Sequence, residues 1–346
     1  MEAGSVAAAL KAQARSLGFA LCRVAPAIAP PHAETFHRWL AEGCAGEMAW
    51  MERNAERRAD PQRVLPGAQS VVVLALPYHQ EAGATQGAQH QIARYAWNED
   101  YHDVIAPKLR LIDAFLQEHG GTQRGYVDTG PVLERDFGAL AGAGWQGKST
   151  MLIHPKLGAW FFLAEVLTTL SLPPDAPLPE RCGRCTRCLD ACPSGALTGP
   201  YRLDARRCIA YLTIELKGSI PEELRPLIGG RIYGCDACAA ACPWNRFAQA
   251  SREAAFAARP AVQLGLRALL ALDDETFRTL FKGSPIKRIK RRGLLRNVCV
   301  ALGNTGTRED LPALQIAAAD PEPLIAEHAA WALAQIRQRA SLHPGA

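Results

Sequence analysis

The spacing of the cysteines constrains this chain more than any other feature of its sequence. Eight of the eleven cysteines lie between residues 182 and 242. A first run, C-x2-C-x2-C-x3-C-P, ends at Pro193, and a second, C-x2-C-x3-C-P, ends at Pro243. The first run is the spacing with which bacterial ferredoxins bind a 4Fe-4S cluster. A cubane cluster needs four thiolate ligands, so eight cysteines supply two clusters and indicate electron transfer.

The position of each cysteine predicts which cluster it binds. In two-cluster ferredoxins the cysteine before the proline ligates the other cluster. We therefore predict a crossed assignment, in which Cys208 replaces the first cysteine that the second run lacks. The two predicted sets are Cys182, Cys185, Cys188 and Cys242 for one cluster, and Cys192, Cys208, Cys235 and Cys238 for the other.

Zinc is the alternative occupant, because CxxC pairs also form zinc ribbons. Three cysteines at x2 spacing followed by Cys-Pro favour the cubane over a zinc tetrahedron. The three isolated cysteines, Cys22, Cys44 and Cys299, are predicted to be small buried hydrophobic residues.

The residues before the cysteine runs predict a mixed domain, so the whole chain is expected to be α+β. Hydrophobic periodicity predicts helices over about 5–17, 33–56 and 103–120, strands at 19–24, 71–78 and 125–128, and a hairpin over 150–168 that turns at 155–158. The stretch LPPDAPLPE (172–180) has four prolines and predicts a linker or an extended arm. We expect three domains, over 1–175, 176–250 and 251–346.

The last hundred residues are rich in Ala and Leu with helical periodicity. RNVCVALGNTG (296–306) and EHAAWALAQI (327–336) have the same pattern and predict two HEAT-like helical repeats. An ordinary helical bundle is the alternative, which two copies do not exclude.

Positive charge is concentrated in the same region. Residues 250–346 contain fourteen Lys and Arg against nine Asp and Glu, an excess that equals the net charge of +5 of the whole chain. The densest stretch, 282–297, has no acidic residue and contains Lys282, Lys287, Arg288, Lys290, Arg291, Arg292 and Arg296. Such a run forms either a solvated helix face or a surface that follows nucleic-acid phosphates.

Residues 142–149 (GAGWQGKS) match the phosphate-binding loop pattern G-x4-G-K-[ST] in the wrong context. That loop must follow a strand and begin a helix, whereas here helical spacing precedes it and a strand pattern follows. We therefore reject nucleotide hydrolysis and expect a Gly-rich approach to another bulky ligand.

Asp128 is the candidate catalytic acid. It follows a predicted strand and precedes a turn, where a carboxyl group is held rigidly at a cleft. The alternative is a helix cap for a helix near Val132. His102 and Arg53 have the same ambiguity.

The chain contains no apolar run of the roughly 18 to 20 residues that a membrane span needs, and no secretion signal is apparent. We expect a cytoplasmic protein without a membrane partner, and nothing in the sequence demands more than a monomer.

Over nearly its whole length the chain resembles the epoxyqueuosine reductase family. The resemblance lies in the first cysteine run and in GEMAWMERNAERRADP (46–61), ARYAWNEDYHDVI (93–105), YVDTGPVLERDFGALAGAGWQGKSTMLI (126–153) and RCIAYLTIELKGSIPEELRPLIGGRIYGCDACAAACPWN (207–245). The last segment is the most specific, because a ferredoxin alone has no reason to contain YLTIELKG.

The resemblance implies a cobalamin cofactor in an N-terminal, nitroreductase-like α+β sheet domain, although the D-x-H-x-x-G cobalamin motif is absent and Ile105 stands where it requires Gly. It implies an oxidoreductase that converts epoxyqueuosine to queuosine at the tRNA wobble position and releases the epoxide oxygen as water. Cob(I)alamin would be the reductant, supplied through the two 4Fe-4S clusters by an external ferredoxin- or flavodoxin-like donor.

The resemblance also implies roles for individual residues. Asp128 matches the family's proton donor, so we predict an apolar, cofactor-covered pocket that raises its pKa. The predicted cobalamin contacts are Arg53, Tyr95, His102, Asp128, Lys148, Ser149, Cys235 and Asp236. The predicted contacts with the anticodon stem-loop are Lys217, Arg231, Lys287, Arg288, Lys290, Arg291, Arg292 and Arg296.

Two alternatives to this function stay open at the level of sequence. One is a corrinoid-dependent reductase of a small molecule, like the reductive dehalogenases, which would not need a basic helical C-terminus. The other is a non-catalytic electron carrier with an RNA-binding tail, for which Asp128 would be dispensable.

Overall fold

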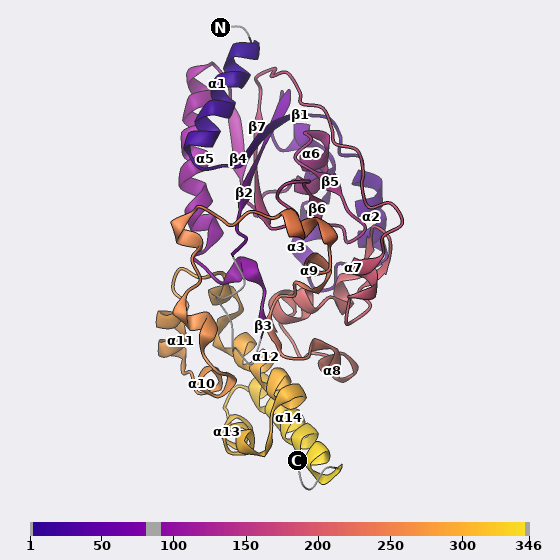
Figure 1. Ribbon diagram of the computed structural model, residues 1–346, viewed down its shortest axis with the longest axis vertical. Coiled ribbons are helices and arrows are strands. Elements are labelled where there is room, and N and C mark those ends of the chain that lie inside the picture. The colour runs from indigo at the N-terminus through magenta and orange to yellow at the C-terminus, as the bar shows by residue number, and fades with distance from the viewer. Residues whose placement is uncertain (1–2, 81–90, 343–346) are drawn as a thin grey trace.

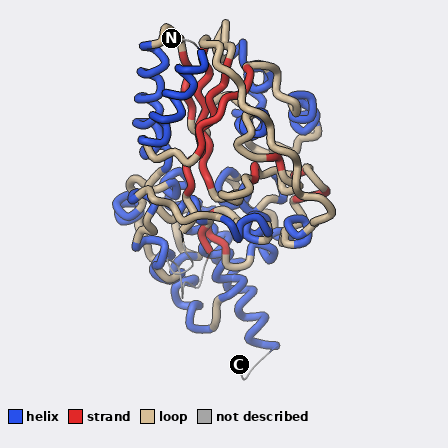
Figure 2. Tube along the Cα trace, turned by 45° about the horizontal axis from the view of Figure 1, so that its top comes forward, coloured by secondary structure: helices blue, strands red, loops and turns tan. Residues whose placement is uncertain are grey.

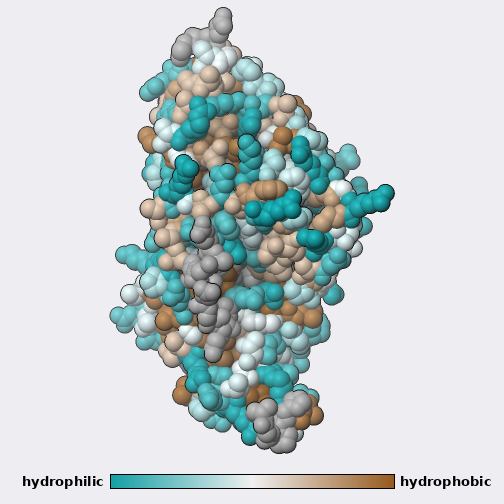
Figure 3. All heavy atoms as spheres, in the orientation of Figure 1, coloured by the Kyte–Doolittle hydropathy of each residue, from teal (hydrophilic) through white to brown (hydrophobic). Residues whose placement is uncertain are grey.

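The structure, a computed structural model, describes residues 3–80 and 91–342. Figure 1 shows a sheet with flanking helices at one end, the cysteine-rich segment in the middle and a group of helices at the other end. On the face drawn in Figure 3, hydrophilic side chains predominate and hydrophobic ones occupy small separate areas. In the described part of the chain, no helix has the length and hydrophobicity needed to cross a membrane.

A four-stranded antiparallel sheet organises the N-terminal half. Its strand order is β1 (Leu21–Pro26), β2 (Ser70–Pro77), β7 (Phe161–Thr168) and β4 (Gln123–Tyr126). The expected strands are therefore present within a few residues of their predicted bounds.

Both faces of this sheet are covered, which explains the continuous apolar run of β2. Side chains of a strand alternate between faces. Val72 and Leu74 pack under α1 (Ala3–Ser16) and α5 (Tyr101–Glu118), whereas Val71 and Val73 pack on the opposite side, toward α6 (Glu134–Leu140). Figure 2 shows the strands between these helices.

The predicted helix over 33–56 is wrong in its continuity. It is divided into α2 (Ala33–Ala41), α3 (Ala49–Arg53) and α4 (Ala55–Ala59). Gly43 and Gly46 between them have φ of 68° and 61°, a left-handed conformation that interrupts a right-handed helix. A Cβ on Gly46 would also overlap the Tyr211 side chain.

The loop that matches the phosphate-binding pattern joins two short strands, β5 (Trp145–Gln146) and β6 (Leu152–Ile153). It follows helix α6 and begins no helix, as its sequence context predicted. The turn expected at 155–158 is present as a bridge between His154 and Gly158. The expected hairpin partner is wrong, because β7 pairs with the sheet strands β2 and β4.

The cysteine-rich segment contains short elements joined by turns. They include α7 (Arg187–Asp190), β8 (Leu197–Gly199), β9 (Arg202–Leu203), the π-helical turn η4 (Tyr211–Glu215), α8 (Arg225–Ile228), β10 (Arg231–Tyr233) and α9 (Ala237–Ala240). Strand β10 pairs in parallel with β3 (Gln91–Ile92), which ties the segment to the N-terminal half. The proline-rich arm is held at Asp175, whose carboxylate accepts hydrogen bonds from the Val24 backbone and the Lys11 ammonium.

The C-terminal part is helical, as expected. It contains α10 (Leu266–Leu270), α11 (Asp274–Leu280), α12 (Lys290–Thr305), α13 (Leu311–Ala317) and α14 (Pro323–Leu342). Helices α12 and α14 approach closely at Gly303, where a Cβ would overlap the Trp331 ring. Cys299 is fully buried in this core, and Cys22 and Cys44 are also buried, as predicted.

One buried polar pair on α12 joins the helices to the cysteine-rich segment. The Arg296 guanidinium is 1% exposed and donates to the carbonyls of Leu212 (2.7 Å), Leu216 (2.8 Å) and Gly218 (2.7 Å). The neighbouring Asn297 amide donates to two further backbone carbonyls, each at 2.8 Å. The expectation that Arg296 contacts tRNA is therefore wrong, because its guanidinium is buried and bonds backbone carbonyls inside the protein.

We predict that Arg296→Met lowers the free energy of unfolding by at least about 3 kcal/mol, because each buried carbonyl left without a donor costs about 1 to 3 kcal/mol. Chemical denaturation monitored by circular dichroism would measure it. Arg292→Met is the matched control, since Arg292 is exposed and bonds one carbonyl. Equal losses in the two variants would contradict the structural role of Arg296.

Candidate active site

Asp128 lies just beyond the end of β4 in a constrained loop. Its φ of 61° is in the left-handed region, which Asp tolerates better than most residues. Its backbone N–H donates to Glu134 Oε1 at 2.9 Å. Helix α6 begins only at Glu134, and no side-chain hydrogen bond caps it. The structure thus does not support the alternative that Asp128 is a helix cap.

Two side chains at the start of α5 approach the Asp128 carboxylate. The Tyr101 hydroxyl donates to Asp128 Oδ2 at 2.5 Å, and His102 Nε2 lies 3.7 Å from the same oxygen. His102 Nδ1 lies 2.7 Å from Asp100 Oδ1, and the same carboxylate caps α5 by accepting from the His102 N–H. His102 was expected at the site. Tyr101 and Asp100 were missed, although their positions at a helix start beside His102 were a readable signal.

The charges of this cluster lower the pKa of Asp128. Burial by itself would raise the Asp128 pKa, but the interactions with His102, at 3.7 Å, and with the Tyr101 hydroxyl outweigh it and leave the pKa below its usual range. The Asp128 side chain is 52% exposed. The polypeptide alone therefore lowers the pKa of Asp128, and the raised pKa expected under a covering cofactor stays a prediction.

His102 is the group that holds a proton at neutral pH. Burial would lower its pKa, but its contacts with Asp100 and Asp128 raise the pKa to about 9. The Asp100 pKa falls to about 2, because its bonds with His102 and Lys287 outweigh burial. At neutral pH the site therefore contains an imidazolium between two carboxylates.

A pair of glutamates lies behind Asp128. Glu165, in the middle of β7, is fully buried, and neither carboxyl oxygen has a hydrogen-bond partner among the described residues. Burial, followed by the charge of Glu134, raises its pKa well above the usual range. Burial, followed by the charge of Asp128, raises the pKa of Glu134 to about 7. The sequence signal, a Glu within the apolar strand FFLAEVLT, was missed.

The start of the basic segment borders the same site. Lys287 Nζ lies 3.2 Å from Asp100 Oδ2, and Arg288 Nη2 lies 2.8 Å from Glu215 Oε1. Arg291 forms an ion pair with Asp320 at 2.6 Å. Acidic partners thus come from elsewhere in the fold, although the run itself contains none. The cations Lys217, Lys290 and Arg292 are exposed, and Arg231 is half-buried.

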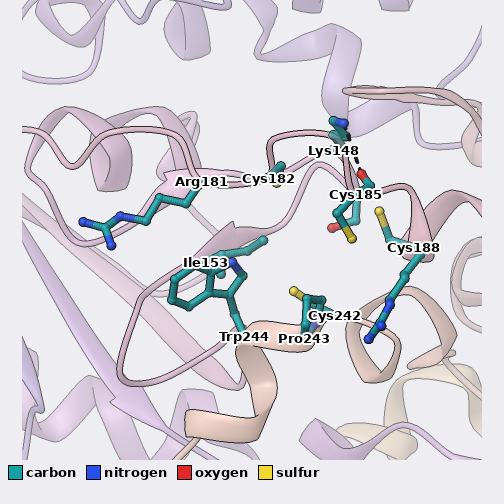
Figure 4. A pocket seen from close by; sticks show the side chains of 11 residues that line it. Lys148, Ile153, Arg181, Cys182, Cys185, Cys188, Cys242, Pro243 and Trp244 are labelled. Atoms are coloured by element: carbon teal, nitrogen blue, oxygen red, sulfur yellow. Dashed lines mark hydrogen bonds between the residues drawn. The ribbon is translucent and has the colours of Figure 1, made fainter.

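The four cysteines predicted for the first cluster line one pocket (Figure 4). The sulfurs of Cys185, Cys188 and Cys242 face one another there. The Lys148 ammonium donates to the carbonyls of Gly183 at 2.6 Å and Cys185 at 3.1 Å. Lys148 and Ser149 thus lie at this pocket, and their contact with cobalamin stays a prediction.

The other four cysteines also lie together and deeper in the protein. Burial and the neighbouring thiols of Cys235, Cys208 and Cys192 raise the pKa of Cys238 to about 12. All eleven cysteines are free thiols. Within the described ranges, no three Cys, His, Asp or Glu side chains converge as a single ion would require. Each cubane ligand binds a different iron, so the two sets of four fit clusters without such convergence.

The remaining predicted cobalamin contacts, Tyr95, Asp236 and Arg53, lie in different surroundings. The Tyr95 ring lies 6.2 Å from Tyr101 and 6.0 Å from Tyr233, measured between ring centroids. Asp236, next to Cys235, accepts from the Arg94 N–H at 2.8 Å, and burial raises its pKa to about 6. Arg53 is exposed on α3.

Arg58, five residues after Arg53, is the buried arginine near the site. Sequence reasoning missed it. Its side chain is 7% exposed and donates to the Val132 carbonyl at 3.0 Å. Burial lowers its pKa, and the nearby charges of Glu134 and Asp128 act in the opposite direction.

Two family models match the chain. A 4Fe-4S double cluster binding domain matches residues 181–245, and a model described as epoxyqueuosine reductase QueG, DUF1730, matches residues 58–129. The curated epoxyqueuosine reductase of Xanthomonas campestris is 43% identical over 339 residues, which cover 95% of this chain and 96% of the relative. That of Escherichia coli is 41% identical over 309 residues, covering 87% and 82%.

Solved structures are similar over the same length. A crystal structure of epoxyqueuosine reductase with an epoxyqueuosine-modified tRNA-Tyr stem loop has a TM-score of 0.89 and 33% identity, covering 96% of this chain and 90% of that one. The enzyme from Bacillus subtilis, with its catalytic Asp loop swung out of the active site, has a TM-score of 0.87 and 32% identity at the same coverage.

The buried glutamate generates a prediction about pH and stability. A carboxyl whose folded pKa is raised stabilises the fold below its unfolded pKa, and this stability is lost as pH rises through the folded pKa. Between pH 5 and 9 the free energy of unfolding should fall more in the wild type than in Glu165→Gln, by at least about 1.4 kcal/mol, or one pKa unit. Denaturation at several pH values measures this, with exposed Glu223→Gln as control. An equal fall in the free energy of unfolding of wild type and Glu165→Gln over this pH range would show that the pKa of Glu165 is not raised in the folded protein.

Proposed function

The chain belongs to the epoxyqueuosine reductase family, and we propose that it reduces epoxyqueuosine to queuosine at the wobble position of tRNA. The main support is the sequence identity of 43% to a curated enzyme of this family over 95% of the chain. The reaction removes the epoxide oxygen as water and leaves an alkene, so it consumes two electrons and two protons. A small-molecule reductase or a simple electron carrier accounts less well for a basic helical region beside the Asp128 site.

Two 4Fe-4S clusters are the electron-carrying cofactors, and the two cysteine sets described above are their proposed ligands. Burial raises the pKa of the Cys238 thiol to about 12, so binding of a cluster there must release a proton.

Cobalamin is the proposed cofactor beside Asp128, where it would supply a strongly reducing metal centre. The residues fit a large group covering this place. Asp128 is half exposed, Tyr101 beneath it is buried, and the buried His102 Nε2 has no hydrogen-bond partner among the described residues. Tyr95 and Asp236 border the same region.

We assign Asp128 as the proton donor and His102 as the group that supplies its proton. In the uncovered site the proton is on His102, 3.7 Å away. When substrate and cofactor exclude water from the carboxylate, its pKa rises and transfer from His102 becomes favourable. Tyr101 orients the carboxylate through its 2.5 Å hydrogen bond.

The proposed division of labour follows the three regions expected from sequence. Residues 1–175 form a nitroreductase-like domain for cobalamin, residues 176–250 a ferredoxin-like domain, and residues 251–346 a HEAT-like region for the tRNA. The proposed tRNA contacts are Lys217, Arg231, Lys287, Arg288, Lys290, Arg291 and Arg292.

Asp128→Asn tests the proton donor. We expect a loss of at least about 100-fold in single-turnover reduction of an epoxyqueuosine stem-loop, since a positioned acid contributes about 10² to 10⁴-fold. The variant should keep about eight irons per chain and its cobalamin absorption. Asp274→Asn, an exposed change on α11, is the control. Unimpaired turnover in Asp128→Asn would remove Asp128 as the acid.

The exposed cations of the basic segment give a second test. The double change Lys290→Glu and Arg292→Glu should weaken stem-loop binding and make its dependence on salt shallower, by about 0.7 in log–log slope for each single-strand phosphate that is no longer neutralised. Fluorescence anisotropy at several salt concentrations measures both quantities. The double change Arg278→Glu and Arg337→Glu, of equal charge, should have little effect. Equal weakening by the two pairs would show that only net charge matters.

A further inference from the structure

The two cysteine sets differ in their neighbours and in how deeply they are buried. The second set includes Cys235, next to Asp236, whose carboxylate contacts the Arg94 backbone near Tyr95. The first set lies at the pocket of Figure 4, under the β5–β6 loop, and its thiols are less deeply buried. Electrons that come from another protein would therefore enter at the first set.

Arginines surround this outer set. Arg181, Arg184 and Arg187 alternate with its cysteines and are all exposed. Arg181 and Arg187 line the pocket with the cysteines, and Arg246 lines an adjoining pocket with Arg187 and Cys242. In the described part of the chain, none of these four arginines forms an ion pair.

Among the described residues, the two nearby carboxylates form no ion pair with these four arginines and are outnumbered by them. The Glu180 carboxylate accepts from the Cys182 N–H, and Asp190 Oδ2 accepts from the Thr186 hydroxyl at 2.9 Å. In Figure 4 the Arg181 side chain extends away from the sulfurs. The positive charge is thus presented outward.

Two exposed aromatic rings flank the same place. Tyr201 and Phe247 are each 44% exposed and are among the few large hydrophobic side chains exposed in the described residues. The Tyr201 N–H donates to the Lys148 carbonyl at 3.0 Å, and the Phe247 ring lies 5.8 Å from that of Trp244, which lines the pocket. The Arg246 guanidinium lies 4.6 Å from the Phe247 ring centroid.

We infer that this surface, the outer patch of Arg181, Arg184, Arg187, Arg246, Tyr201 and Phe247, docks a small acidic electron-carrier protein. The inference rests on the proposed function, which requires an external reductant. Arg and aromatic residues are the types enriched at the centres of protein interfaces. Opposite charge accelerates encounter and orients the partner, and electron-transfer complexes need only small interfaces. Each encounter oxidises the carrier by one electron, so two encounters supply the two electrons of one turnover.

RNA is the competing occupant, because arginines and aromatic rings also bind single-stranded nucleic acid. The position of the patch favours the carrier. The wobble nucleoside must reach Asp128, where Lys287 and Arg288 supply positive charge. The outer patch instead adjoins the less deeply buried cysteine set.

The test reverses three charges of the patch in the holoenzyme with Arg181→Glu, Arg184→Glu and Arg187→Glu. A control with the same change in charge carries Arg110→Glu, Arg124→Glu and Arg278→Glu at exposed positions outside the patch. The probe is an oxidised flavodoxin, with binding measured by calorimetry at low and high salt. We expect at least 10-fold weaker binding and a loss of salt dependence in the patch variant, and less than 2-fold change in the control. Unchanged flavodoxin binding in the patch variant would overturn the inference.

A second measurement separates docking from catalysis. Reduced flavodoxin should reduce the patch variant at least 10-fold more slowly, whereas a neutral photoreduced deazaflavin should reduce both variants equally and support turnover. If the wild-type holoenzyme reduced epoxyqueuosine neither with flavodoxin nor with deazaflavin, the proposed function would be refuted instead. Iron content checks the clusters, and lysine at the three positions should restore most of the binding. Loss of stem-loop binding together with intact flavodoxin binding would assign the patch to RNA.

Discussion

The arrangement of the site depends on the buried hydrogen bonds from Arg296 and Asn297 of α12. Their side chains satisfy carbonyls of the turn after Cys208 and of β10 just before Cys235, so the helical region and the second cysteine set are positioned by the same contacts. Strand β10 in turn pairs with β3, which precedes Tyr95 and the start of α5. Burying these two polar side chains is favourable only when their hydrogen bonds are complete, so these bonds fix the three parts of the chain relative to one another.

The chemistry of the site depends on how deeply each ionisable side chain around the Asp128 loop is buried. Asp128 is exposed and carries donors on one side, so it is ionised until something covers it. His102 holds a proton beside it, and the buried Glu165 lies behind with its pKa raised. The proposed proton transfer from His102 to Asp128 would therefore need no large motion of the fold, because excluding water changes the relative pKa values of the two groups.

The sequence predicted the local elements well wherever a pattern was long or chemically specific. The strand at 71–78, the helix at 103–120 and the three buried isolated cysteines are all present. Predictions failed where distant residues decide the outcome. Arg296 belonged to a basic run, but the backbone carbonyls that surround it come from about eighty residues earlier. The hairpin at 150–168 turns where expected, yet β7 pairs with β2 and β4, since the sheet needs a central strand covered on both faces. Arg58, Tyr101 and Glu165 were missed, because burial gives each its role.

By itself the sequence determined the cysteine spacing, and with it an electron-transfer function and the expectation of two sets of four thiols, because the spacing of the first run is typical of 4Fe-4S ligation. It also determined the family, through motifs that run nearly the whole length of the chain. Only the tertiary structure decided the ionisation of Asp128, which of the cations remain exposed, and which cysteine set faces outward. Those properties follow from burial and from neighbours far away along the chain, and no local pattern carries that information.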